Sequence, residues 1–86
     1  MKQFVYTIQD PLGIHARPAG MIVKLAKNYA DTSITLSCNG KDAKASALMK
    51  LMSLGVKEGS EVTITAEGAA EEEAIAAMQE FFRNTL

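Results

Sequence analysis

The chain has no tryptophan, a single cysteine, a single histidine and no long apolar run. One cysteine cannot form an internal disulfide or a cysteine-based metal cluster, so we expect a reducing, cytoplasmic compartment. Without a run of about 18–20 apolar residues we expect no membrane insertion. The first residues also lack the apolar stretch of a signal peptide. The net charge of −1 argues against a general nucleic-acid binder.

The composition that remains is that of one small globular domain. The 86 residues are 48% apolar and 22% charged, which favours a folded chain and a single domain over residues 1–86. The charge is divided unevenly along the chain. Residues 1–57 hold seven Lys and one Arg against three Asp, a net charge of +5, whereas residues 58–86 have a net charge of −6. This asymmetry fits either two solvated faces or a basic docking face for acidic partners.

Hydrophobic periodicity predicts the element order β-α-β-β-α-β-α. Alternation of apolar and polar residues predicts four strands, at Lys2–Ile8, Ser33–Cys38, Lys41–Ala45 and Glu61–Glu67. A helical period predicts helices at Ala16–Tyr29 and Ala47–Leu54, and a last helix opened by Glu71, Glu72 and Glu73. We expect a hairpin turn at Asn39–Gly40. The pattern therefore predicts an α+β domain of two layers, with the helices on one face of an antiparallel sheet.

Local signals refine the helix ends. Ser46 is a candidate N-cap and Gly55 a candidate C-cap of the second helix. We expect Gly68 to break the last strand. Pro18 falls in the first turn of the first helix, where a missing N–H costs nothing.

His15 is the one imidazole, and it lies between a glycine-containing loop and the start of the first helix. A lone histidine usually caps a helix or packs against neighbouring residues. Here the unpaired N–H groups of a helix start form an anion site, and Arg17 adds a guanidinium suited to phosphoryl oxygens. An ordinary imidazole has a pKa of about 6.5 and is largely neutral, hence nucleophilic, at pH 7. Reversible phosphorylation of His15 is therefore a hypothesis that stands beside the packing role.

The sequence gives less support to other chemical functions. A zinc site built on His15 and Cys38 lacks further ligands, and Cys38 fits an inward strand position. No serine lies in a nucleophile-elbow context, although composition leaves a Ser-His-carboxylate triad open. An RNA-binding sheet would need aromatic residues on its middle strands, which have none.

The segment Gly13-Ile14-His15-Ala16-Arg17-Pro18-Ala19, followed by Leu51-Met52-Ser53-Leu54-Gly55, closely resembles the HPr family of the phosphoenolpyruvate–sugar phosphotransferase system. The resemblance covers nearly the whole chain. It implies an open-faced β-sandwich with strand order 1-4-2-3 and three helices on one face. It also implies a monomeric carrier, neither an enzyme nor dependent on a cofactor or metal, that takes a phosphoryl group from Enzyme I and gives it to a sugar-specific enzyme IIA.

The family's residue roles map onto this sequence position by position. His15 corresponds to the phosphorylated histidine, with Nδ1 as the acceptor, Arg17 to the phosphate-stabilising arginine, and Ala16 and Pro18 to the helix start. Family members dock Enzyme I, enzyme IIA and regulatory proteins through their first two helices. The corresponding residues here are Gly20, Met21, Lys24, Lys27, Leu48, Met49 and Met52. We expect some of the Met and Leu side chains to belong to the core.

Two departures from the family pattern qualify the resemblance. Leu12 stands where a hydrogen-bonding residue is common. Gap-free alignment puts Ala47 at the serine that a dedicated kinase modifies in Gram-positive relatives, so we expect that site to be lost. Ser46, one residue earlier, is the candidate substitute. The alternatives are a regulatory paralogue of a nitrogen-type phosphotransfer branch, or an allosteric binding protein of the same fold. An intact His15-Ala16-Arg17-Pro18 segment argues against a pure binder.

Overall fold

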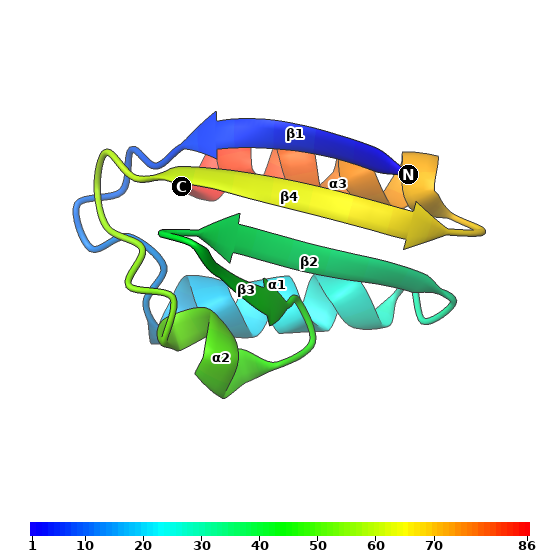
Figure 1. Cartoon of the computed structure of the whole chain (residues 1–86), viewed down its shortest axis with the longest axis horizontal. Helices are drawn as coiled ribbons and strands as arrows, with labels where there is room; N and C mark the ends of the chain where they lie inside the picture. The colour runs from blue at the N-terminus through cyan, green and yellow to red at the C-terminus, as the bar shows by residue number, and fades with distance from the viewer.

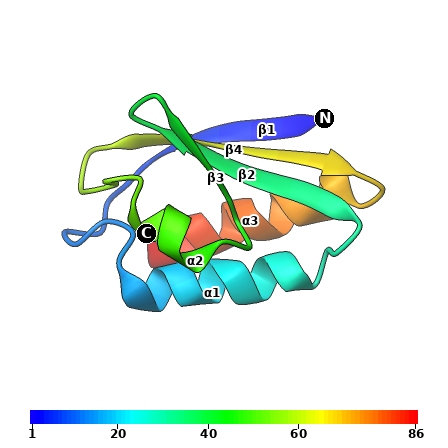
Figure 2. The same ribbon diagram turned by 60° about the horizontal axis from the view of Figure 1, so that its bottom comes forward.

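The computed structural model describes all 86 residues as one antiparallel sheet covered on one face by three helices. The elements in chain order are β1 (Lys2–Thr7), α1 (Ala16–Lys27), β2 (Thr32–Cys38), β3 (Lys41–Lys44), α2 (Leu48–Met52), β4 (Glu61–Gly68) and α3 (Glu71–Thr85). The strands pair in the order β1-β4-β2-β3 (Figure 1), and the helices lie together below the sheet in Figure 2. The predicted open-faced α+β sandwich is confirmed. None of the helices has the length and apolar character that a bilayer crossing requires.

The two faces of the sheet explain why it has one covering layer. A row of directly opposed residues facing the helices is apolar: Phe4, Ile64, Leu36 and Ala43. The neighbouring row, on the other face, is Gln3, Thr65, Thr35 and Lys44. Hydroxyl, amide and ammonium groups remain hydrated on the uncovered face, so no second layer is needed to bury it.

Phe82 anchors α3 to the sheet. Its ring is fully buried and meets the rings of Phe4 and Tyr6 of β1 edge-on, with centroids 6.0 and 5.7 Å apart. Phe81 makes a third edge-on contact at 5.9 Å. Such T-shaped pairs add to the burial of apolar area that stabilises this side of the core.

The hairpin between β2 and β3 turns at the two residues that the sequence predicts. Asn39 and Gly40 both have positive φ, +56° and +76°, as a two-residue turn between strands requires. The Asn39 side chain also donates a hydrogen bond from Nδ2 to the carbonyl of Leu54 at 3.2 Å. The turn is thereby tied to the segment that follows α2.

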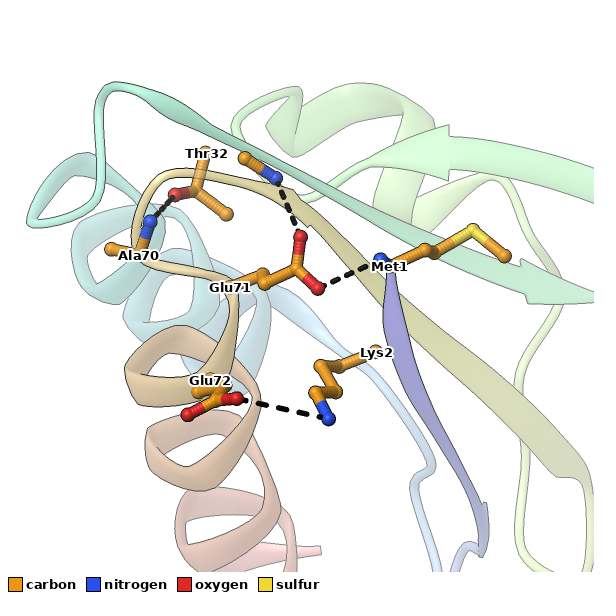
Figure 3. Close-up of polar contacts among 7 residues, drawn as sticks. Met1, Lys2, Thr32, Ala70, Glu71 and Glu72 are labelled. Atoms are coloured by element: carbon orange, nitrogen blue, oxygen red, sulfur yellow. Dashed lines mark hydrogen bonds and ion pairs between the residues drawn. The ribbon is translucent and has the colours of Figure 1, made fainter.

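At the far end of the sheet, Glu71 joins the start of α3 to the start of β1 (Figure 3). Its Oε2 lies 2.7 Å from the amino group of Met1, and its Oε1 accepts the N–H of Gly68 at 3.2 Å. These contacts hold the pKa of the Glu71 carboxyl below its ordinary value. The hydrogen bond from the amino group is the larger cause, and the hydrogen bond from the N–H of Gly68 is the next. Lys2 and Glu72 form a second, exposed ion pair at 3.8 Å.

The second helix begins later than predicted. It spans Leu48–Met52 in place of Ala47–Leu54, and its N-cap is Ala47, so the prediction that Ser46 caps it is wrong. The N–H of Ala47 donates to the carbonyl of Lys44 in the preceding turn, while its carbonyl accepts the N–H of Leu51. These two bonds place the helix boundary at Ala47, and no side chain caps it.

Other element ends also differ from the sequence-based prediction. The strands β1 and β3 each end one residue earlier than predicted, and β2 begins one residue earlier. Gly55, with φ +73°, lies two residues beyond the C-cap Ser53 and is not itself the cap. The first helix ends at Lys27 because the N–H groups of the next two residues bond three residues back, which tightens the last turn. Gly68 ends β4 as its last paired residue, opposite Thr32.

Candidate functional site

A closely packed loop delivers His15 to the start of α1. Gly13 has φ +66°, and a Cβ at that position would lie 2.1 Å from the carbonyl oxygen of Val56. Only glycine therefore permits the loop to pack against residues 56–57. The N–H groups of Gln9 and Asp10 donate to the carbonyl of Leu86, which ties the loop to the end of α3 as well.

His15 is the N-cap of α1, yet its side chain takes no part in capping. Its backbone is extended (φ −106°, ψ −173°), and its carbonyl accepts the N–H of Ala19 at 2.9 Å. The side chain is 36% exposed, and the residues on either side of the site, Ile14 and Pro18, are buried. The backbone is thus anchored while the imidazole stays accessible, so the capping role considered for a lone histidine does not apply.

The start of α1 offers hydrogen-bond donors to an anion. The backbone N–H groups of Ala16 and Arg17 have no backbone acceptor, and the next residue, Pro18, has no N–H. The first turn contains no acidic side chain that would compete for them. Two donors and the positive end of the helix therefore lie directly after His15, an arrangement that suits phosphoryl oxygens.

Arg17 shares an open hollow of about 400 Å³ with His15. The wall of the hollow is completed by Asp10 from the loop, Met21 from α1, and Asn84 and Thr85 from α3. Arg17 is exposed and lies away from the core. Of the four consecutive residues predicted for the site, His15, Arg17 and Pro18 line the hollow, and Ala16 contributes its backbone N–H beside it.

The hollow is also lined by residues that were not predicted for the site from the sequence. Asp10 lies with its Oδ2 3.9 Å from Nε2 of His15, while its Oδ1 accepts the N–H of Leu12 at 2.8 Å. An aspartate two residues before the N–H that it accepts forms an Asx turn, which fixes the carboxylate within its own loop but does not by itself place it near the histidine. Leu12 is 70% exposed and does not line the hollow.

The side chains predicted to dock partners are all exposed. Met21, Leu48, Met49 and Met52 are 44%, 41%, 74% and 42% exposed, so the expectation that some belong to the core is wrong. Leu51 alone anchors α2 in the core, because a helix of five residues can turn only one residue fully inward. Gly20, Lys24 and Lys27 are exposed along α1. Helices α1 and α2 lie side by side (Figures 1 and 2), and we refer to their exposed residues named above as the α1–α2 face.

The remaining candidates lie away from the hollow. Cys38 is buried, as predicted for an inward strand position. Ser46 is exposed before α2, beside a separate groove at the other end of α1, and Ala47 is half-buried.

Comparison with known proteins identifies similar sequences and structures. Residues 2–84 match the sequence family described as the PTS HPr component phosphorylation site. The chain is 39% identical over 79 residues to the phosphocarrier protein HPr of Mycoplasma genitalium, covering 92% of this chain and 90% of that protein.

Solved structures agree with this similarity. A histidine-containing phosphocarrier protein from Mycoplasma is similar with a TM-score of 0.93 at 33% identity, over 98% of this chain and 94% of that one. HPr from Thermoanaerobacter tengcongensis is similar with a TM-score of 0.91 at 37% identity, over 98% and 93%.

Proposed function

Because this chain belongs to the HPr family of phosphocarrier proteins, we propose that His15 accepts a phosphoryl group from Enzyme I and passes it to a sugar-specific enzyme IIA. One observation carries the proposal. A half-buried but accessible imidazole stands at the N-cap of α1, directly before two backbone N–H groups without backbone acceptors, and Arg17 lines the same hollow. A nucleophile and a site for phosphoryl oxygens are thus adjacent.

The chemistry needs little beyond this arrangement. The lone pair of Nδ1 attacks phosphorus, and the bond from phosphorus to the donor breaks with its electron pair returning to the donor. The N–H groups of Ala16 and Arg17 and the guanidinium of Arg17 stabilise the charge on the phosphoryl oxygens. Enzyme I and enzyme IIA supply the rest of the catalytic machinery, and the chain acts as a covalent relay that needs no cofactor.

The openness of the hollow suits a relay. A carrier must surrender its phosphoryl group, so it should not bind that group more tightly than the acceptor does. A shallow, solvent-open site meets this need better than a deep pocket. It also lets the active centres of two different partners approach His15 in turn, in the cytoplasm where we place the relay.

The α1–α2 face is the surface that we propose for docking. It combines exposed Met21, Leu48, Met49 and Met52 with lysines near the helix ends, among them Lys24 and Lys27. Methionine side chains adapt to differently shaped partners, and lysines attract acidic ones. A partner seated there would reach the hollow, because Met21 belongs to both surfaces.

Phosphorylation by Enzyme I and phosphoenolpyruvate, followed by intact-mass analysis, tests the proposal. We expect an adduct of ~80 Da that is lost in acid, as an N–P bond is, and that does not form on His15→Ala. A wild-type chain without the adduct, or a His15→Ala variant with an equal one, would refute the proposed function.

A further inference from the structure

The carboxylate of Asp10 is held in place by the loop that carries it. Its Oδ1 accepts the N–H of Leu12 at 2.8 Å, and its main-chain carbonyl accepts the N–H of Gly13 at 3.0 Å. Its own N–H donates to the carbonyl of Leu86 at 2.9 Å. With Oδ1 committed to the loop, Oδ2 is the oxygen that faces the imidazole, 3.9 Å from Nε2 of His15.

Asp10 is the one acidic side chain that lines the hollow around His15. Arg17 is the other charged residue there, and α3 contributes the uncharged Asn84 and Thr85. The first turn of α1 has no acidic residue. The negative charge that acts on the imidazole is therefore that of Asp10, and it lies on the Nε2 side of the ring.

We propose that Asp10 is a positioning residue that keeps the imidazole proton of His15 on Nε2 and leaves Nδ1 free to accept the phosphoryl group. A neutral imidazole carries its proton on one nitrogen or the other, and the groups facing the two nitrogens decide which. A carboxylate beside Nε2 favours the proton there, as the aspartate of a Ser-His-Asp triad fixes the tautomer of its histidine. This inference rests on the proposed function, since it concerns how His15 would receive its phosphoryl group.

With the proton on Nε2, neither transfer step moves a proton. The lone pair of Nδ1 forms the N–P bond as the donor's bond to phosphorus breaks, and the ring becomes cationic with Nε2–H retained. The charge of Asp10 offsets the positive charge of this ring and forms an ion pair with it. When the group passes on, the N–P electron pair returns to Nδ1 and the ring is neutral again.

The tautomer can be measured directly in the free protein. The ¹⁵N shifts of the two imidazole nitrogens, recorded in labelled protein at a pH where the ring is neutral, report which nitrogen carries the proton. Asp10→Asn is the sharpest variant. Its amide oxygen can still accept the N–H of Leu12, so its NH₂ group takes the place of Oδ2 and donates toward Nε2. Asp31→Asn is the matched control, because it removes an equal charge at the opposite end of α1.

The expected result is a predominantly Nε2–H wild type and a shift toward Nδ1–H in Asp10→Asn, with Asp31→Asn like the wild type. Transfer from phosphorylated Enzyme I should slow by about tenfold or more in Asp10→Asn, as for other residues that orient a functional histidine. An unchanged tautomer in Asp10→Asn would overturn the positioning role, whatever the transfer rate. A wild type that gains no phosphohistidine would refute the proposed function instead, and the tautomer would still report on Asp10.

Discussion

Arg17 lies exposed in the first turn of α1 and lines the hollow around His15. Arg17→Ala should slow phosphoryl transfer to His15 by roughly ten- to a thousandfold, because it removes one charge-assisted contact of ~1.5–4 kcal/mol in the transition state. Single-turnover transfer from phosphorylated Enzyme I measures the loss. Arg83→Ala, an exposed arginine of α3, is the control. A large fall in melting temperature with normal transfer would show that Arg17 stabilises the fold instead.

Glu71 predicts a dependence of stability on acid pH. Because contact with the amino group of Met1 lowers the pKa of this carboxyl in the folded state, its pairing stabilises the protein fully above its ordinary pKa of about 4.3. This stabilisation is lost as pH falls through the lower folded-state pKa. Urea unfolding at a series of pH values should show a steeper acid loss in wild type than in Glu71→Gln. Glu72→Gln, at an exposed pair, should keep the wild-type slope, and identical slopes in all three proteins would contradict the prediction.

At the scale of elements, the start of α2 yields a prediction about capping. Ala47 holds the N-cap with extended backbone (φ −107°, ψ 90°) and no side-chain acceptor. Ala47→Ser should therefore raise the free energy of unfolding by about 1 kcal/mol. Ser46→Ala, outside the helix, should change it by less than about 0.5 kcal/mol. Chemical denaturation of the two variants measures both values, and the opposite ranking would place the helix boundary one residue earlier.

The same two positions predict the response to a bacterial HPr kinase and ATP. We expect little or no acid-stable phosphate on the wild type, if the predicted gap-free alignment of Ala47 with the kinase-targeted serine is right. Ala47→Ser should become a substrate. Peptide mass spectrometry locates the phosphate, and efficient modification of Ser46 in the wild type would overturn the alignment.

Sequence patterns predicted most elements but not every boundary. Alternation in β1 and the Asn39–Gly40 pair located strands and a turn because those signals are local. The strand order came from the family resemblance, since periodicity does not say which strands pair. The N-cap prediction was wrong because the hydrogen bond from the N–H of Ala47 to the carbonyl of Lys44 depends on the path of the chain, which the preference for serine at N-caps does not reveal.

The residues of the site, likewise, were predicted only in part. His15 and Arg17 were predictable because they lie within one short motif at a helix start. The approach of Asp10 to the imidazole was not, because it depends on how the loop packs around Gly13 against residues 56–57. The high exposure of Met49 was not predicted because α2 is too short for a helical period to identify its core face.

For the whole molecule, the uneven charge predicts salt-dependent encounter. If the basic part of the chain, residues 1–57, attracts an acidic partner surface, the bimolecular rate constant for transfer from Enzyme I should fall as NaCl rises. Met49→Ala should lower this rate constant several-fold at every salt concentration, because it removes an exposed apolar contact from the α1–α2 face. Val5→Ala, exposed on the uncovered sheet face, is the control. A salt-independent rate, or equal effects of the two variants, would argue against docking on this face.

The most direct test of the relay isolates its second step. The phosphorylated chain, freed of Enzyme I and phosphoenolpyruvate, is mixed with a panel of sugar-specific and nitrogen-type enzyme IIA domains, and the mass of each protein is followed over time. The relay predicts that this chain loses ~80 Da while a sugar-specific domain gains the same mass, faster than the phosphohistidine hydrolyses alone. Transfer to the nitrogen-type domain alone would assign the chain to that branch. Loss of the phosphoryl group to water at the same rate with and without every domain would contradict a carrier role for His15.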